Sequence, residues 1–278
     1  MSETDPNRRM RIARQHVQTD QLLGIASVPQ GEAAAPPPLD ETAEPAPAPA
    51  AAAPTDSTTA STEPSGAVPT GSPWSAAPEL NRAARQQLLE QMDRDEVSCC
   101  TKCPLSEGRT RTVFGEGDPD ARIMFIGEGP GQNEDEQGRP FVGRAGELLN
   151  KQIAAMGLER EQVFIANVVK CRPPNNRAPT PAEVDACEPY LRRQIQGIRP
   201  DAIITLGGPA TKLILDTKLG ITRLRGTWAT YDGLLPTGPQ VPVMPTFHPA
   251  YLLRSYTEDN RRRVWSDLQQ VMERLGMK

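Results

Sequence analysis

The pattern of hydrophobic and polar positions predicts strands and helices that alternate along most of the chain after residue 79. Short apolar runs, such as residues 123–126, are typical of buried strands, and apolar residues at a spacing of three and four, such as Leu149, Ile153 and Met156, are typical of helices. The predicted strands span 122–127, 163–169, 202–206, 228–231 and 241–244. The predicted helices span 79–92, 143–156 and 257–275, with one that begins after Thr180 and a short one that ends at Leu215.

The start of the helix after Thr180 is the clearest local signal. Thr180 is an N-cap residue, Pro181 takes the first helical position, and Glu183 completes a capping box. Strands that alternate with helices indicate an α/β fold, a three-layer α/β/α sandwich around a mainly parallel central sheet. In such a sheet, ligands bind outside the carboxyl ends of the strands.

Three predicted loops lie at that edge of the sheet. One is the glycine-rich segment 127–146, one follows Asn167, and one contains His248. Glycine lets a backbone turn tightly and approach a ligand closely, while the acidic residues of the first loop argue against a simple phosphate cradle. We therefore expect a pocket for a neutral planar ligand, with Phe141 as its stacking face.

The chain has three predicted regions. Residues 1–27 carry a weakly amphipathic pattern that predicts a short helix, and residues 28–79 are rich in Ala, Pro, Ser and Thr. Such a segment cannot bury enough apolar surface to offset its ordering entropy, so we predict a disordered linker. The same Pro/Ala-rich arm could instead bind a protein partner. Residues 80–278 form the predicted folded domain.

Composition narrows the class of protein. The 278 residues include 29 prolines and carry a net charge of -4, which gives no global sign of nucleic-acid binding, although a local basic face would suffice. No apolar run approaches the ~20 residues of a membrane span, and no secretory signal is recognisable. We expect a cytoplasmic monomer without a membrane contact.

The cysteines predict a metal site. A cytoplasmic protein with five cysteines is expected to use them for metal binding or catalysis rather than for disulfides. Cys100 and Cys103 have the C-x2-C spacing, and Cys171 and Cys187 form a second pair. Four thiolates can hold a zinc ion or an iron-sulfur cluster, and the spacing does not choose between them. It also does not choose between Cys99 and Cys100.

Four separated segments together resemble family 4 uracil-DNA glycosylases. Residues 127–143 resemble the family's first motif, residues 248–254 its second motif, and residues 167–177 its central segment, and the cysteine pattern agrees with the family's 4Fe–4S cluster, with Cys100 and Cys103 in register. The resemblance spans about residues 86–276. It implies excision of uracil from single- or double-stranded DNA, with release of free uracil and an abasic site in base excision repair.

The resemblance also implies roles for the pocket residues. Phe141 would stack on the flipped uracil, Asn167 would bond its amide edge, and His248 would bond O2 as negative charge develops there. Glu134 would exclude the methyl group of thymine. Glu128 would place the attacking water and stabilise the sugar cation, and the backbone around Gly127 and Gly129 would line the pocket.

The remaining implied contacts are with DNA. Leu252 would wedge into the space that the base leaves, and Arg254 would touch a phosphate. We also expect a phosphate track from basic residues flanking the three loops, namely Arg109, Arg111, Arg144, Lys170, Arg172, Arg177 and Arg254. The sequence departs from the family at Gly129, where the family usually has Ala.

Two functional hypotheses follow. The first is a hydrolytic enzyme, because a related branch that crosslinks to DNA uses a His in an insertion after the first motif, and this chain has neither. The second is a metal-stapled module that binds damaged DNA without catalysis. A mere binder would not need Asn167 and His248 together.

Overall fold

A computed structural model describes residues 73–74, 80–232 and 240–277, all of which belong to one compact unit, Val68–Lys278. The helix predicted over 1–27 and nearly all of the linker predicted over 28–79 lie outside the described residues. Within that linker, Trp74 is described: its Nε1 donates a hydrogen bond to the carbonyl oxygen of Pro200 at 2.8 Å. The contacts of the folded domain therefore begin before residue 80.

The described residues form a six-stranded sheet with the strand order β1-β3-β2-β4-β6-β5. The four central strands are parallel, and the two edge strands, β1 and β5, are antiparallel to their neighbours. This confirms the predicted mainly parallel sheet. The strands are β1 (Glu116–Gly117), β2 (Ile123–Gly127), β3 (Phe164–Asn167), β4 (Ala202–Leu206), β5 (Ala229–Tyr231) and β6 (Val241–Thr246).

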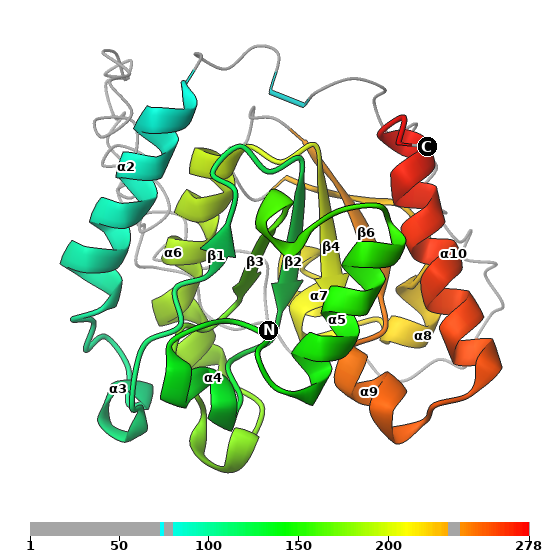
Figure 1. Ribbon diagram of the computed structural model, residues 1–278. Coiled ribbons are helices and arrows are strands. Elements are labelled where there is room, and N and C mark those ends of the chain that lie inside the picture. Colours follow the sequence, from blue (N-terminus) through cyan, green and yellow to red (C-terminus); the bar gives the residue numbers. More distant parts are fainter. Residues whose placement is uncertain (1–72, 75–79, 233–239, 278) are drawn as a thin grey trace, which may run out of the picture. The chain divides into compact units, whose positions relative to one another are not determined.

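Helices cover both faces of the sheet, as Figure 1 shows. The α-helices are α2 (Arg82–Met92), α3 (Leu105–Gly108), α4 (Gln132–Gln137), α5 (Arg144–Ala155), α6 (Pro181–Ile198), α7 (Gly208–Ile214), α8 (Ile221–Leu224), α9 (Pro249–Arg254) and α10 (Glu258–Arg274). A π-helical turn, η1 (Asp93–Val97), and two 3₁₀ turns, η2 (Arg160–Gln162) and η3 (Pro174–Asn176), complete the described elements. No described helix has the length and apolar character needed to cross a membrane.

The side chains of β2 show how the three layers are held together. Ile123 and Phe125 lie in one buried apolar cluster with residues of α5, α9 and α10, whereas Met124 and Ile126 lie in a second cluster with residues of α2, α6 and α7. Successive side chains of a strand point to opposite faces, so one strand contributes to both cores. All five residues of β2 are buried, as expected for a central parallel strand.

Several predicted elements are confirmed. The strand over 202–206 is observed with the same bounds, and Thr180 caps α6 through the predicted capping box with Glu183. The glycine-rich loop differs from the prediction because α4 interrupts it. Gly131 is the N-cap of this helix, and it ends at Gly138 in the left-handed conformation. The helix α9 directly after His248 was also not predicted.

Candidate active site

A cavity of about 610 Å³ opens at the carboxyl ends of the parallel strands, within the usual range for ligand sites. All three predicted loops contribute to it, and parallel pairing explains part of this convergence, because Gly127 at the end of β2 is the register partner of Asn167 at the end of β3. The residues that line it include Glu128, Gly129, Glu134, Phe141, Asn167, Arg177, Gly207, Gly208, Pro209, Ile221, Phe247, His248, Tyr251 and Arg254.

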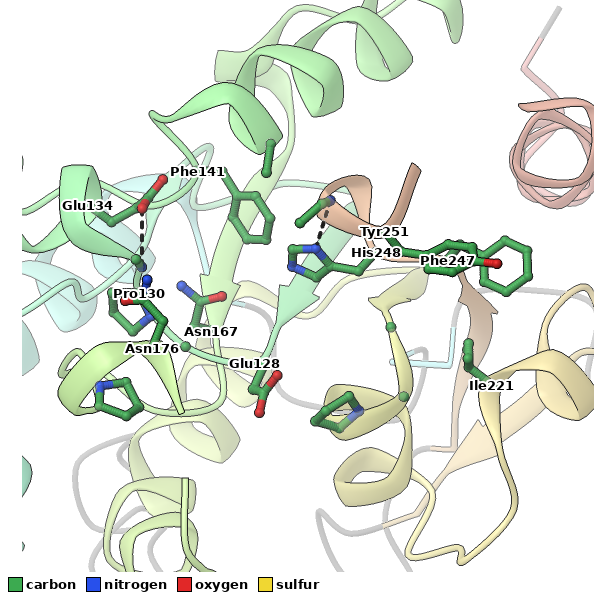
Figure 2. Close-up of a pocket in the computed structure, with 18 of the residues that line it drawn as sticks. Glu128, Pro130, Glu134, Phe141, Asn167, Asn176, Ile221, Phe247, His248 and Tyr251 are labelled. Carbon is green, nitrogen blue, oxygen red and sulfur yellow. Dashed lines mark hydrogen bonds between the residues drawn. The ribbon is translucent and has the colours of Figure 1, made fainter. Parts of the chain in front are cut away.

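His248 is held as a neutral hydrogen-bond donor. It is the N-cap of α9, and its Nδ1 accepts a hydrogen bond from the backbone N–H of Ala250 at 3.0 Å (Figure 2). Burial, with a smaller contribution from the charge of Arg254 and against an opposing effect of Glu134, lowers the pKa of His248 to about 4. At neutral pH the single ring proton therefore lies on Nε2.

Phe141 and Asn167 point toward the same space as His248 (Figure 2). The ring centroids of Phe141 and His248 are 5.6 Å apart, with an angle of 32° between the rings. Gly127 makes this arrangement possible. A Cβ atom there would lie 2.4 Å from Oδ1 of Asn167 and 2.6 Å from Cζ of Phe141. The glycine thus leaves room for both side chains to meet at the end of the sheet.

Two polar atoms in this cavity are buried without a hydrogen-bond partner among the described residues. They are Oδ1 of Asn167 and Oε1 of Glu128. Buried polar atoms are nearly always paired, so such exceptions are typical of a site that awaits a ligand. Burial also raises the pKa of the Glu128 carboxyl group above its usual value. Of the predicted site residues, these two are the ones whose polar groups the protein leaves unsatisfied.

Glu134 organises the loop that carries Phe141. One carboxylate oxygen accepts hydrogen bonds from the backbone N–H groups of Val142 and Gly143 at 2.9 and 3.0 Å, and the other accepts from Gly131 at 3.1 Å. This bonding was not predicted, and it ties two parts of the glycine-rich segment together. Its predicted action against the methyl group of thymine stays a prediction.

Leu252 is buried and does not fit its predicted role as a wedge in the DNA. Its side chain is only 1% exposed, it packs in the apolar cluster with residues of α5 and α10, and it does not line the cavity. The predicted wedge would need an exposed side chain. The preceding residue, Tyr251, is 38% exposed, lines the cavity and packs its ring against Phe247, with centroids 4.9 Å apart. Helical geometry turns Tyr251 outward and Leu252 inward.

The predicted basic track is only partly supported. Arg177 and Arg254 line the cavity, although Arg177 also pairs with Glu183 at 2.7 Å. Lys170 is 1% exposed, and its Nζ donates to the carbonyl oxygen of Asn167 at 2.8 Å and to Oε1 of Gln194 at 2.6 Å. Lys170 is therefore a buried structural residue and cannot meet a phosphate.

Arg109 is also removed from the track, since it lies beside the cysteines. Its Nη1 donates to the carbonyl oxygen of Cys100 at 2.7 Å and to Sγ of Cys171 at 3.3 Å.

Gly129, where the resemblance predicts Ala, lies close to the side chain of Val169. A Cβ atom at this position would lie 2.8 Å from Cγ2 of Val169, which is closer than real contacts allow. Alanine would therefore require Val169 to shift. The absence of a Cβ atom at Gly129 therefore leaves room for the side chain of Val169, which follows β3.

The four predicted metal ligands line one small second cavity. Cys100, Cys103, Cys171 and Cys187 surround it together with Arg109, Lys170 and Tyr190. Cys99 does not line this cavity: it is exposed, and its thiol contacts the carbonyl oxygen of Asp95 at 3.3 Å. Cys100 and not Cys99 therefore lies with the other three cysteines, whereas the spacing alone left both open.

The donor set of this cavity consists of four cysteine thiols. Among the described residues, no three Cys, His, Asp or Glu side chains converge where a single metal ion could bind. Burial raises the pKa of Cys187 to about 11 and also raises the pKa of Cys171. These thiols would become thiolates only beside a bound cation.

Sequence reasoning missed one wall of the active-site cavity. Gly207, Gly208 and Pro209 follow β4 and line the cavity, and Ile221 of α8 lies beside them. The signal for the first three was present, since they follow a predicted strand at the same sheet edge as the three loops. Ile221 belongs to a four-residue helix that has no recognisable pattern.

Comparisons with known proteins identify the family of this chain. Residues 114–269, more than half of the chain, match the Uracil DNA glycosylase superfamily. The chain is 49% identical over 188 residues to a type-4 uracil-DNA glycosylase of Thermotoga maritima, covering 67% of this chain and 94% of that protein. It is 42% identical over 184 residues to the type-4 enzyme of Archaeoglobus fulgidus, covering 66% and 92%. The chain belongs to the uracil-DNA glycosylase superfamily and, within it, to the type-4 family.

Proposed function

We propose that this protein removes uracil from DNA by hydrolysing its N-glycosidic bond, which releases free uracil and leaves an abasic site for base excision repair. The observation that carries this proposal is the pair of unpartnered buried oxygens, on Asn167 and Glu128, beside the neutral ring of His248. A base within a duplex cannot reach these groups, so it must be flipped out of the stack. The non-catalytic alternative is not favoured, because the compared type-4 relatives are named as glycosylases.

His248 acts on the leaving base. Cleavage of the glycosidic bond leaves negative charge on the uracil ring and positive charge on the sugar. The Nε2–H group of His248, whose Nδ1 is occupied by Ala250, would donate to O2 of the base as that charge develops. A neutral donor suits this role, and removal of such a donor typically costs about 2.7–4 kcal/mol of transition-state stabilisation.

Phe141 and Asn167 recognise the base. The Asn167 amide offers both a donor and an acceptor to the N3 and O4 edge of uracil, and its unpartnered Oδ1 would receive the N3–H group. The ring of Phe141 provides the apolar face on which the base stacks. Glu134, besides holding the loop, would deny space to the methyl group of thymine at C5.

Glu128 acts on the sugar side. Its unpartnered Oε1 could accept a proton from an attacking water and lie near the developing sugar cation. Both actions require the carboxylate form. Because burial raises the pKa of this group, the active form is lost at a higher pH than for an exposed glutamate.

The four thiols of the second cavity suit a 4Fe–4S cluster, with Cys100, Cys103, Cys171 and Cys187 as its ligands. We assign the cluster a structural part, which is to fix the chain segments that contribute its ligands. Arg109 and Lys170 already donate hydrogen bonds to cysteine sulfur, from Nη1 to Cys171 and from the backbone N–H to Cys187, at 3.3 and 3.2 Å. Such donors stabilise the negative charge of thiolate ligands.

DNA would lie across the mouth of the active-site cavity. Arg254 and Arg177 line that mouth and would contact phosphates. Tyr251, whose ring packs against Phe247, is exposed on α9, where the resemblance predicted an exposed Leu252. An exposed aromatic ring can stack on a neighbouring base, so Tyr251 is our candidate for the residue that supports the DNA next to the flipped nucleotide.

The test uses full-length, cluster-containing protein and two oligonucleotides that differ only by uracil or thymine at one position. Each is incubated single-stranded and in a duplex and is then treated with alkali, which breaks the strand at an abasic site. We expect scission of the uracil strand alone. Intact uracil strands after incubation with iron-loaded protein would overturn the proposed function.

A further inference from the structure

Phe141, the proposed stacking residue, has an unusual backbone conformation. Its φ angle is +51°, in the left-handed region of the backbone that residues other than Gly, Asn and Asp rarely adopt. For a bulky aromatic residue this conformation is strained and persists only where the surroundings enforce it. Strain of this kind clusters at ligand sites, so the groups that hold Phe141 are of functional interest.

Two features hold the peptide of Phe141 in place. Gly146 at the start of α5 packs directly against it: a Cβ atom there would lie 1.8 Å from the carbonyl oxygen of Phe141. On the other side, the guanidinium group of Arg160 donates hydrogen bonds to the carbonyl oxygens of Pro140 and Phe141, the latter at 3.3 Å. One planar side chain thus fixes two consecutive carbonyl groups.

Arg160 is itself held in position. Its Nε donates to Oε1 of Glu116 at 2.7 Å, and its Nη1 also donates to Oδ1 of Asn150 at 2.7 Å. The Arg160 side chain is only 13% exposed. The rigid fork of a guanidinium group can serve these acceptors together, which the single ammonium group of lysine cannot do.

Arg139 offers a natural comparison within the same cluster. It donates to both oxygens of Glu116, to Oε2 at 2.8 Å and to Oε1 at 3.1 Å, but its side chain is 57% exposed, and no contact between it and the carbonyl group of Phe141 is found among the described residues. Both arginines therefore share one acidic partner, and only Arg160 reaches the strained peptide.

We propose that Arg160 is a positioning residue for uracil recognition: by clamping the carbonyl groups of Pro140 and Phe141, it keeps the ring of Phe141 beside His248 and Asn167. This inference rests on the proposed function of the cavity. Without the clamp, the backbone of Phe141 relaxes toward negative φ, and the ring leaves the place where the base stacks. Arg160 touches neither the base nor the sugar and acts only through Phe141.

The test is a double-mutant cycle in the cluster-containing, full-length protein. Arg160→Lys and Arg160→Ala are each combined with Phe141→Ala, and Arg139→Ala is the matched control. We expect Arg160→Ala to lower kcat/KM for a uracil oligonucleotide by about 10- to 100-fold, since small misplacements of positioning groups have effects of this size. Arg160→Lys should give a smaller loss, and Arg139→Ala should stay within about twofold because an exposed ion pair contributes little.

The cycle separates positioning from general stability. In the Phe141→Ala background, the Arg160 substitutions should have almost no further effect, and inhibition by free uracil should weaken equally in the Arg160→Ala and Phe141→Ala proteins. The inference would be overturned if the losses in kcat/KM from the Arg160 and Phe141 substitutions multiplied in the double variants. It would also be overturned if Arg160→Ala left inhibition by free uracil unchanged. If Arg160→Ala does not fold, Arg160→Lys carries the same comparison. Wild-type protein that excises no uracil contradicts the proposed function instead, so the two failures are distinguishable.

Discussion

The two cavities of this protein differ in how their polar groups are satisfied, although one short segment serves both. Asn167 reaches the active-site cavity, and Cys171, four residues later, lines the cysteine cavity. In the first, Oδ1 of Asn167 and Oε1 of Glu128 have no partner among the described residues. In the second, the sulfur atoms of Cys171 and Cys187 already receive hydrogen bonds. This difference agrees with our proposals that the first cavity binds and releases a base and that the second holds a permanently bound cluster.

Lys170 connects these two regions. Its backbone N–H bonds to Sγ of Cys187, while its buried Nζ bonds to the carbonyl oxygen of Asn167 and to Gln194. A buried network that is fully satisfied makes its surroundings rigid. We therefore interpret the cysteine cavity as the support of the wall that carries Asn167. Damage to the two cavities should therefore have different signatures.

The largest expected effect is on the active-site cavity. His248→Ala should lower the single-turnover rate of uracil excision by about 10²–10³-fold, because the donor to the developing oxyanion is lost. Iron content should stay near the wild-type value, and the melting temperature should fall by only a few degrees, because the N-cap hydrogen bond to Ala250 is lost. The control is His16→Ala, at the other histidine of the chain, which lies outside the matched family region. A His248→Ala protein with a near-normal rate would remove this residue from the mechanism.

The next effect concerns the cysteine cavity. Cys103→Ala should lower iron content and melting temperature, by about 2–4 °C for each kcal/mol of stability lost, and should weaken DNA binding. The matched control is Cys99→Ala, which alters an exposed thiol outside the cavity. Calorimetry and iron analysis make the measurement. A stable, DNA-binding Cys103→Ala protein that has lost only kcat would show that the cluster takes part in the chemistry.

The pH dependence should show one acidic limb. The rate should fall about tenfold per pH unit below the raised pKa of Glu128, because its carboxylate form is needed, and should be level above it. His248, with a pKa of about 4, is neutral between pH 6 and 8, so no fall in rate is expected as pH rises through that interval. Glu128→Gln should be slow and should lack the limb. A wild-type rate that falls as pH rises through neutrality would indicate instead that His248 must be protonated.

The smallest effect tests the corrected assignment on α9. Tyr251→Ala should raise KM by about fivefold, corresponding to about 1 kcal/mol of stacking, without loss of stability. Tyr256→Ala is the control, since this residue is 58% exposed and does not line the cavity. Leu252→Ala should instead destabilise the protein by about 2–5 kcal/mol, as expected for a buried leucine. A stable Leu252→Ala protein that binds DNA poorly would restore the wedge assignment.

The sequence predicted the elements whose pattern is local. The buried run of β4 and the capping box at Thr180 are examples, and both are confirmed. Short helices such as α4 and α8 were missed because four to six residues carry too little periodicity.

The three predicted loops do line one cavity at the sheet edge, but the orientation of their side chains was not predictable. Burial of Leu252 and Lys170 depends on packing against distant elements. The clamp by Arg160 joins residues 19 or more positions apart in the chain, which no local pattern encodes.

The central claim is that the active-site cavity removes uracil while the cysteine cavity supports it, and Asn167→Ala tests this most directly. Free uracil released from a single-uracil duplex is quantified for wild-type and Asn167→Ala proteins with equal iron and sulfide content. We predict that the variant keeps its cluster and releases uracil about 10- to 100-fold more slowly, as expected for loss of a paired base contact. Equal release by the two proteins, or loss of the cluster together with activity, would contradict the account.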